Sequence, residues 1–558
     1  MNQEKAAVRA SIFSHLAGMA IATTTKALWD RHVFDLFDRP TEWLDFEDIV
    51  GHARANRGYL RVALRLLLSC GWLKLRIAEN ARRSFYALTP EGRTALEVAP
   101  LLFGEVVPFL SKAIFLEDFL FERSDGSILP SLQEIVRRRR EGWMAAASQN
   151  ATTARVYDQI RGYLNGMVIG PAMVALSRAG VLDQLAQGSI EISSLRGNRA
   201  SLSCIFDLLA MEGWTTREKN AVSLTAPGQY AAQIATSYGV TVSYLPLFDN
   251  LSILLFGNPR IPRLDENGVE ILVNREMNVW GSGGAHKTYF QKVDDIILEI
   301  FNRPIEQQPH GICDMGCGDG TFLEHLYHVV QNSTMRGTVL HKHPLILVGA
   351  DFNRVARRVS KQRLRRAAIP TCHVIAGDIN RPAQLASDLE ELGLDIHDLL
   401  HVRSFLDHNR PYSAPSNYLQ GERQARSTGA FAYLGDEIYA DVLEENLVRH
   451  LRHWAPYVGR FGLIVLELHT LPPELTAANL EKTPAVSYDG THGYSDQYLV
   501  ELPIFLDCAR EAGLHADPRF QSAFPPSELA TVSLNFFTAP AASPINLLFD
   551  RQAAETLR

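Results

Sequence analysis

The second half of the chain is a series of short apolar runs separated by segments with helical periodicity. After about residue 276 five such runs follow one another: HGICDMG, LILVGADF, CHVIAGDI, LLHVRSFL and FGLIVLELH. Strands that alternate with helices in this way are typical of a parallel sheet covered by helices. A final hairpin is expected in ADPRFQSAF and TVSLNFFTA. We therefore predict one α/β domain with the doubly wound strand order in the last half of the chain.

The first of these runs ends in an acid that is followed by glycines at alternate positions. In GICDMGCGDGTF, Asp314 ends the run, and Gly316, Gly318 and Gly320 come after it. Glycines allow a sharp turn and let a ligand approach the backbone closely. Since ligands of doubly wound sheets lie across the carboxyl ends of the strands, this turn is predicted to bind one.

Two more acids end the next two runs. Asp351 in LVGADFN stands where a carboxylate would accept both hydroxyls of a ribose. Asp378 in IAGDIN is placed to take an adenine amino group, with Ile379 against the ring. A dinucleotide fold would have GxGxxG instead, with its third glycine one residue later to make room for a pyrophosphate. The pattern found, DxGxGxG, favours a nucleoside ligand of another kind.

The segments DMGCGDG, GADF and AGDI resemble motifs I, II and III of the class I S-adenosylmethionine-dependent methyltransferases. This resemblance covers roughly the last half of the chain and implies a Rossmann-like fold with a seven-stranded sheet. It implies that Asp314 and the three glycines face the amino acid and sulfonium part of the cofactor. It further assigns Asp351 to the ribose and Asp378 to the adenine, and Phe352 and Ile379 are included in the predicted cofactor site.

The segment NVWGSGGAHKTYF precedes the sheet and is expected to form a loop followed by a helix. Gly281, Gly283 and Gly284 would form the loop, and His286, Tyr289 and Phe290 would open the helix. The segment is similar to the loop before the first strand in the C-methyltransferase domains of polyketide synthases. We therefore add Gly283 and Tyr289 to the predicted cofactor site; the alternative is an ordinary interdomain turn.

The first half of the chain contains a degenerate repeat. LRLLLSCGWLKL is answered by IFDLLAMEGWTT, and FYALTPEGRTAL by VSLTAPGQYAA. Each copy predicts helices that end at Gly-Trp, a two-stranded wing and a helix that begins after Thr, which is a winged-helix pattern. The predicted divisions are a first winged-helix-like domain (1–120), a helical linker (121–160), a second winged-helix-like domain (161–250), a connecting and cofactor-lid segment (251–290) and the methyltransferase domain (291–558).

Winged helices often read DNA, and the first copy has Arg54, Arg57, Arg61 and Arg65 near the recognition helix. The net charge of −7 and the second copy, which is poor in basic residues, favour a dimerising or substrate-covering module instead, so no nucleic acid partner is expected. One such unit before the sheet resembles the small-molecule O-methyltransferases, where it dimerises. Two units leave a homodimer, or a monomer with an internal pseudo-partner, both open. The run Arg137 to Arg140 is either a solvated face of a linker helix or a docking patch for an acidic carrier protein.

Methylation of carbon or oxygen requires removal of a proton, for which histidine is suited near neutral pH. Histidines and polar residues are expected in loops after the strands: His401, His408, His469, His492, Asp407, Asp496 and Gln497. In one hypothesis His469 or His492 is the general base, oriented by Asp496 or Glu467, and His401 belongs to the same catalytic set. In the other, a divalent metal is bound by ligands drawn from His401, His469, His492 and Gln497.

We therefore expect an S-adenosylmethionine-dependent methyltransferase of secondary metabolism. C-methylation of an activated acyl substrate of polyketide type, bound to a carrier, or of a 2-oxo substrate stands ahead of O-methylation of a small hydroxylated metabolite. A winged-helix regulator that senses the cofactor, or an idle scaffold of a synthase, would be the alternatives of another class. Six scattered cysteines and the lack of a long unbroken apolar run predict a cytoplasmic protein with no membrane partner.

Overall fold

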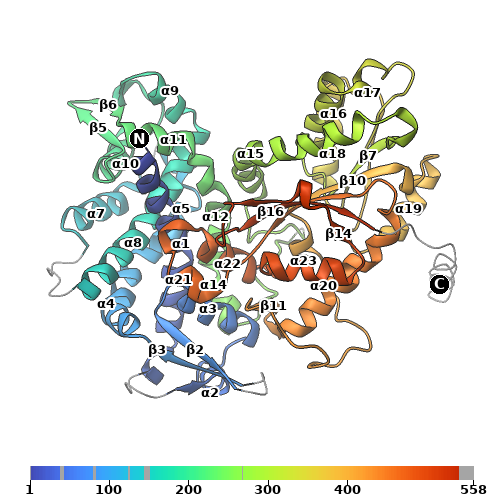
Figure 1. The fold of residues 1–558 in the computed structure, drawn as a ribbon. Helices are drawn as coiled ribbons and strands as arrows, with labels where there is room; N and C mark the ends of the chain where they lie inside the picture. Colours follow the sequence, from blue (N-terminus) through green and yellow to red (C-terminus); the bar gives the residue numbers. More distant parts are fainter. Residues whose placement is uncertain are drawn as a thin grey trace. The chain divides into compact units, whose positions relative to one another are not determined.

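The computed structural model describes residues 2–37, 43–78, 83–123, 126–143, 151–266 and 268–539, and the chain divides into two compact units (Figure 1). The helical unit comprises Met1–His286, Gly429–Ile438 and Leu471–Gln497. The sheet unit comprises Lys287–Thr428, Tyr439–Thr470 and Tyr498–Arg558. Two segments from within the second half of the sequence thus belong to the helical unit.

The sheet unit contains the predicted sheet, with strand order β14-β16-β13-β10-β7-β8-β9. Strands β7, β8, β9, β10 and β13 run parallel, and β16 is antiparallel to β13. A further short strand, β15, pairs with β16, so that the sheet has eight strands where seven were predicted. The strands are β7 (Gly311–Met315), β8 (Ile346–Asp351), β9 (Cys372–Ala376), β10 (Leu399–Ser404), β13 (Leu463–Leu468), β14 (His515–Ala516), β15 (Ser522–Phe524) and β16 (Val532–Thr538).

The central strands β7 and β13 are buried along their whole length, which is why their sequences are continuous apolar runs. On one face, Ile312, Leu400 and Ile464 from three neighbouring strands pack in one core with apolar residues of α15 and α16. The helices of this unit are α15 (Arg275–Phe301, whose first part lies in the helical unit), α16 (Thr321–Ser333), α18 (Arg354–Arg366), α19 (Pro382–Glu391), α20 (Ala440–Trp454) and α23 (Leu502–Glu511).

The loop predicted in NVWGSGGAHKTYF is wrong, because the whole segment lies within α15. Gly281 is needed there for packing and not for a turn: a Cβ at this position would lie 2.6 Å from the Cα of Gly239. The backbone of Gly283 and His286 is helical, and their side-chain environment lies outside the described part of the structure. A run of glycines can therefore mark a close contact between helices as well as a loop.

The helical unit confirms the winged-helix repeat. The first copy has α2 (Phe46–Ala53), α3 (Arg57–Ser69), β2 (Leu73–Ile77), β3 (Ser84–Leu88) and α4 (Pro90–Val106). The second has α9 (Val181–Gln187), α10 (Arg199–Met211), β5 (Thr215–Glu218), β6 (Ala221–Leu224) and α11 (Ala226–Gln233). A short strand, β1 (Leu44–Asp45) or β4 (Ile190–Glu191), extends each predicted two-stranded wing to three strands, with orders β1-β3-β2 and β4-β6-β5.

Both copies use the same side-chain contacts where the wing leads into its last helix. The hydroxyl of Thr89 accepts the Gly92 N–H (2.9 Å) and donates to the Gly71 carbonyl (2.7 Å). The hydroxyl of Thr225 accepts the Gly228 N–H (3.1 Å) and donates to the Gly213 carbonyl (2.6 Å). Equivalent polar contacts at equivalent positions show that the sequence repeat is also a structural repeat.

Two helices of equal length, α1 (Asn2–Trp29) and α8 (Ala151–Arg178), precede the two copies and pack against each other. They approach closely at glycines: a Cβ at Gly18 would lie 2.4 Å from Tyr163 Cα, and one at Gly166 would lie 2.2 Å from the His15 carbonyl oxygen. By length and composition alone, two helical segments are apolar enough to cross a membrane: Gln3–Trp29, with 61% of its 18-residue apolar window buried, and Pro90–Ala113, with 39% of its window buried. The bent pair Thr152–Arg178 and Val181–Gln187 passes the same test together. The absence of a membrane partner therefore stays a prediction.

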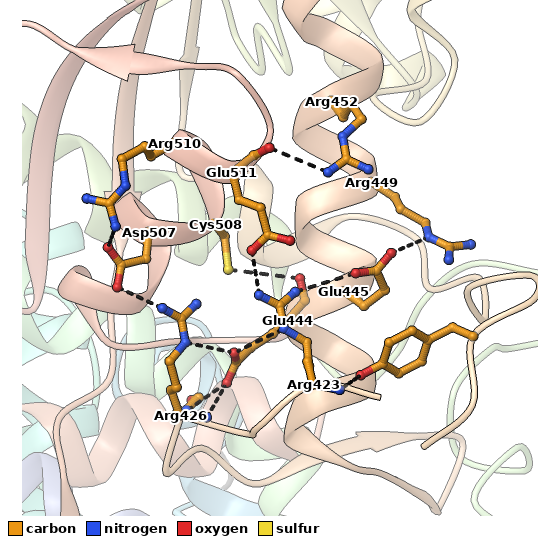
Figure 2. Close-up of polar contacts among 12 residues, drawn as sticks. Arg423, Arg426, Glu444, Glu445, Arg449, Arg452, Asp507, Cys508, Arg510 and Glu511 are labelled. Atoms are coloured by element: carbon orange, nitrogen blue, oxygen red, sulfur yellow. Dashed lines mark hydrogen bonds and ion pairs between the residues drawn. The ribbon is translucent and has the colours of Figure 1, made fainter. Parts of the chain in front are cut away.

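A charged network fixes the segment that precedes α20 in space (Figure 2). Glu444 on α20 is fully buried and accepts the backbone N–H groups of Arg426 (2.7 Å) and Ser427 (2.8 Å). The side chain of Arg426 forms ion pairs with Glu444 (3.3 Å) and with Asp507 of α23 (2.8 Å), while that of Arg423 pairs with Glu511 (2.6 Å). Residues 423–427 are thereby held against α20 and α23.

Candidate active site

Strands β7, β8 and β9 bring the predicted acids to the carboxyl edge of the sheet. Asp314 lies opposite Gly349 in the parallel register, and Asp351 lies opposite Ala376, two residues before Asp378. The three carboxylates therefore follow one another across neighbouring strands at the edge where a doubly wound sheet binds its ligand.

Asp314 is a buried carboxylate, 1% exposed, and among the described residues its Oδ1 has no hydrogen-bond partner. Burial, and then the nearby charge of Asp351, raise the pKa of Asp314 well above its usual value. A buried acid without a partner is costly unless a cation or donor satisfies it. S-adenosylmethionine carries a sulfonium and an ammonium group, so this position fits the cofactor that the motifs imply.

Asp351 accepts the backbone N–H groups of Gly318 (3.0 Å) and Asn353 (2.7 Å). Gly318 has a φ of +53°, and a Cβ there would meet no atom within 4 Å, so the turn after β7 is open at this point. Burial raises the pKa of Asp351 and outweighs these two N–H donors. The turn and the carboxylate are thus joined directly, beside space that a ligand could enter.

The rest of the predicted cofactor site contains Asp378 and Ile379, predicted to face the adenine, and Phe352. Asp378 accepts the Asn380 N–H (2.9 Å), and the buried Ile379 accepts the indole N–H of Trp454 (2.8 Å) through its carbonyl. Phe352 is 81% exposed directly after Asp351, which is rare for a large apolar side chain. Their roles toward the cofactor stay predictions.

Tyr289 belongs to a cluster of aromatic rings that the sequence analysis missed. Its ring lies 6.0 Å from that of Phe405 and 4.9 Å from that of Phe524. Phe405 directly follows β10 and has a φ of +55°, a conformation that is strained for a bulky residue. Such strain is common at functional sites, but no sequence pattern indicates it, because nothing in the residue type distinguishes it from a core phenylalanine.

Comparison with known families gives the same answer as the site geometry. Residues 270–535 match the model described as the AprA MT2-like domain, a methyltransferase family. Residues 270–535 form an AprA MT2-like methyltransferase domain. Residues 8–75 match the AprA N-terminal domain and residues 165–258 the AprA winged helix domain. The chain is an S-adenosylmethionine-dependent methyltransferase, and the predicted cofactor class is confirmed.

The solved structures that are similar to the chain share little of its sequence. The mitomycin 7-O-methyltransferase MmcR is 13% identical, with 70% of this chain and 99% of that one covered and a TM-score of 0.41. Human N-acetylserotonin methyltransferase is 12% identical (71% and 100% covered, TM-score 0.36), and the citrinin polyketide synthase CMeT domain is 12% identical (76% and 100% covered, TM-score 0.33). No curated protein matches the chain.

Within the methyltransferase domain, His401 does not lie in a loop as predicted. It lies inside β10, opposite Cys313, and its Nε2 is 3.0 Å from the Ile396 carbonyl oxygen. Burial lowers its pKa to about 4. His401 is therefore a neutral residue within the sheet, and its predicted position on a reactive loop was wrong.

His469 does follow a strand, β13, but its ring is fully buried. Nδ1 lies 3.2 Å from the Val500 carbonyl oxygen, and Nε2 lies 2.7 Å from the Ser533 hydroxyl. Burial lowers the pKa of His469 to about 4. Both ring nitrogens thus have internal partners, which suits a structural residue better than a general base.

His492, Asp496 and Gln497 belong to the helical unit. His492 is on α22 (Ala485–Gly493), with Nδ1 2.9 Å from the Tyr488 carbonyl oxygen, and the Gln497 amide donates to the Tyr244 hydroxyl (2.8 Å). Asp496 accepts the hydroxyl of Tyr59 (2.7 Å) and forms an ion pair with Arg263 (2.7 Å). The contacts of Asp496 therefore do not support its predicted role of orienting a histidine.

The predicted metal ligands do not form a cluster. Among the described residues, no group of three or more His, Cys, Asp or Glu side chains could hold a metal ion. Of the predicted ligand set, His401 lies within a strand and His469 has both ring nitrogens on internal partners, so these two residues do not suit a metal. A metal site that includes His492 and Gln497 stays a prediction.

The methyltransferase domain has instead a buried pair formed by His408 and Glu467. Nδ1 of His408 lies 2.5 Å from Glu467 Oε1, and the backbone N–H of His408 donates to Oε2 (3.2 Å). Glu467 is the second-last residue of β13 and is 1% exposed; His408 is in the turn after β10 and is 6% exposed. A carboxylate that fixes the tautomer of a histidine is the usual arrangement for a general base.

Buried arginines surround this pair. Arg410 donates to Asn446 Oδ1 (2.8 Å) and to the Asp407 carbonyl (2.7 Å), while among the described residues its Nη2 has no hydrogen-bond partner. Arg403 forms an ion pair with Asp407 (3.0 Å) and lies over the ring of Trp454. Although burial opposes ionisation, Arg403 and His450 hold the pKa of Asp407 below its usual value. The turn after β10 thus holds a histidine paired with a carboxylate and, two residues later, a buried arginine.

Proposed function

We propose that the chain methylates the carbon next to the carbonyl of an activated acyl substrate, most simply a thioester on a carrier. The observation that carries this proposal is the turn 407–410, where the His408–Glu467 pair is followed after two residues by Arg410 with a buried, unpartnered Nη2 among the described residues. Methylation of such a carbon requires both a base for its proton and a donor for the enolate oxygen.

The roles follow from the contacts. Glu467 holds Nδ1 of His408, so that the proton transfer is assigned to Nε2. His408 and Arg410 are both next to Tyr498: the Tyr498 N–H donates to the His408 carbonyl (2.7 Å), and the Arg410 guanidinium lies 5.5 Å from the Tyr498 ring. Arg410 would donate Nη2–H to the enolate oxygen, where buried charge has its largest effect.

The proposed reaction removes one proton from the substrate carbon and adds one methyl group to it. His408 removes the proton from the substrate carbon, and the electron pair is held as an enolate by Arg410. Asp314, Asp351 and the turn at Gly318 would hold the cofactor, which would supply a methyl group from its sulfonium centre to the enolate carbon and leave as S-adenosylhomocysteine. The proton on His408 then passes to solvent.

Proton abstraction is the step that tests the proposal apart from methyl transfer. The protein, saturated with S-adenosylhomocysteine, is incubated with malonyl-pantetheine or 3-oxobutyryl-pantetheine in D₂O, and exchange at the carbon between the carbonyl groups is followed by NMR. We expect exchange above the uncatalysed rate, lost about 100-fold or more in His408→Ala. In Glu467→Gln we expect a smaller loss with a changed pH profile, since Glu467 acts through His408.

Methyl transfer from S-adenosylmethionine is then measured by mass spectrometry with the same thioesters and with small hydroxylated aromatic compounds. Transfer to a thioester carbon supports the proposal, and Arg410→Gln should lower kcat there. Transfer to hydroxyl oxygen alone, with no thioester exchange, would overturn C-methylation in favour of O-methylation, for which Arg410 is not needed. The cofactor affinity of each variant serves as the control for folding.

A further inference from the structure

Helix α18 concentrates positive charge on a chain whose net charge is −7. Its 13 residues, RVARRVSKQRLRR, contain six arginines, one lysine and no acid. The helix begins three residues after Asp351 and is held by Asn353, whose side chain accepts the N–H groups of Val355 (2.7 Å) and Ala356 (3.3 Å). The charge therefore lies on a firmly capped element beside the cofactor edge of the sheet (Figure 1).

Four of these cations form one exposed row: Arg354, Arg358, Lys361 and Arg365. Positions i, i+4, i+7 and i+11 lie on one side of a helix and span about 16 Å. Next to the row, Val355 is 57% and Val359 is 38% exposed, while Ser360 and Leu364 seat the opposite side in the domain. Within the described ranges, none of the four cations of the row forms an ion pair, so the row presents charge that the described protein surface does not neutralise.

Two other basic side chains of α18, Arg357 and Arg363, have contacts within the protein. Arg357 donates to the carbonyls of Asp351 and Phe352 (both 2.7 Å), and Arg363 pairs with Asp319 (2.7 Å) and Glu324 (3.2 Å). These two arginines hold α18 against the residues that follow β7 and β8. For the exposed row, no such contacts are found in the part of the chain that the structure describes.

The run Arg137 to Arg140, considered above as a docking patch, differs from the row on α18 because its side chains form ion pairs within the protein. Its members lie at the end of α7 (Leu129–Arg140) and all form ion pairs: Arg137 with Glu134 and Glu141, Arg138 with Glu105, Arg139 with Glu212, and Arg140 with Asp207. A partner would have to replace contacts that already exist. The dense arginine run is therefore a paired surface, and the docking interpretation belongs to α18 instead.

We propose that the row Arg354, Arg358, Lys361 and Arg365 docks an acidic helix of the carrier protein that delivers the acyl substrate. This inference rests on the proposed function, since it names the partner of the same site. A helix with carboxylates at the same spacing would match the row in charge and length, and Val355 and Val359 offer a small apolar contact beside it. A bilayer would require a wider apolar face than two valines, and a nucleic acid would meet an otherwise net negative chain.

Reversal of charge in the row tests this docking face. The variant Arg358→Glu/Lys361→Glu/Arg365→Glu is compared with Arg358→Lys/Lys361→Arg/Arg365→Lys, which keeps every charge at the same positions. Kinetics are measured with malonyl-loaded acyl carrier protein and with malonyl-pantetheine. We expect charge reversal to raise KM for the carrier-bound substrate about tenfold or more and to leave KM for malonyl-pantetheine and cofactor affinity unchanged. The charge-keeping variant should behave as the natural chain.

Other outcomes separate the two proposals. If both variants use the carrier-bound substrate equally well, or if reversal impairs the two substrates alike, α18 is not the docking face. If the natural chain methylates neither thioester, the proposed function fails, and docking is judged by binding of the carrier protein itself, measured by fluorescence anisotropy with rising NaCl. Binding that reversal abolishes would still support docking. Loss of duplex DNA or anionic vesicle binding on reversal, with carrier binding unchanged, would overturn it.

Discussion

Ionisation of the buried Asp314 is expected to oppose folding and to favour binding of the cofactor. Its carboxylate is buried, and among the described residues Oδ1 has no partner, so ionisation opposes folding. We expect Asp314→Asn, which keeps the shape and removes the charge, to weaken S-adenosylmethionine binding about tenfold or more without lowering the free energy of unfolding at pH 7. Calorimetric titration and urea unfolding measure the two quantities. Asp388→Asn on α19 is the control, and equal losses of binding in both variants would refute the assignment.

The pH dependence of Asp314 has a definite sign. Because burial raises its pKa in the folded state, the folded protein holds this proton above the unfolded pKa of about 3.9. Its contribution to stability is therefore lost as pH rises from that value through the raised pKa. Cofactor affinity should rise over the same upper range, because the charged carboxylate pairs with the cofactor cation. Urea unfolding and titration between pH 5 and pH 8 should show both trends in the natural chain and neither in Asp314→Asn.

At the scale of single elements, the two wing-to-helix junctions make a paired prediction. Thr89 and Thr225 each cap a helix and donate to the carbonyl of the glycine before a tryptophan. We expect Thr89→Ala and Thr225→Ala each to lower the free energy of unfolding by about 1 kcal/mol, and the serine variants to change it little. The two losses should add, since the junctions lie in separate copies. A loss confined to one copy would show that the junctions are not energetically equivalent.

The elements were predictable from sequence where the pattern was local. Apolar runs fixed β7, β8, β9, β10 and β13, and the Gly-Trp and Thr signals fixed both winged helices. The glycines of α15 were misread because a loop and a close helix contact, such as that of Gly281 with Gly239, require the same residue. A local sequence pattern does not distinguish these two reasons for a glycine.

The places of the three acids were predictable and the partner of His408 was not, for a physical reason. Each acid ends its own strand, so its place follows from one run of sequence. The pair of His408 and Glu467 depends instead on the register of β10 with β13, where Ser404 lies opposite Leu466. That register decides which histidine meets a carboxylate, and it left His401 in the sheet and His469 facing Ser533. His408 was among the histidines expected in loops, but Glu467 was expected to orient His469 or His492 instead.

At the scale of the whole molecule, the repeat determines what the chain is expected to do in solution. The N-terminal helices of the two copies, α1 and α8, pack on each other inside the helical unit, an arrangement that would suit the internal pseudo-partner considered from the sequence beside a homodimer. A surface already occupied by the second copy is not available to another chain. We therefore expect a monomer at micromolar concentration, measured by size-exclusion chromatography with light scattering. A concentration-independent dimer would contradict this expectation.

The same packing can be tested by a single methyl group. A Cβ at Gly166 would lie 2.2 Å from the His15 carbonyl oxygen, which is backbone and cannot move aside without separating the helices. Gly166→Ala should therefore lower the free energy of unfolding by about 1–3 kcal/mol, despite alanine's higher helix propensity. Gly51→Ala on α2 is the matched control, since a Cβ there meets nothing within 4 Å and should be neutral or stabilising. If Gly166→Ala were as stable as Gly51→Ala, the close crossing of α1 and α8 would be refuted, and with it the reason to expect a monomer.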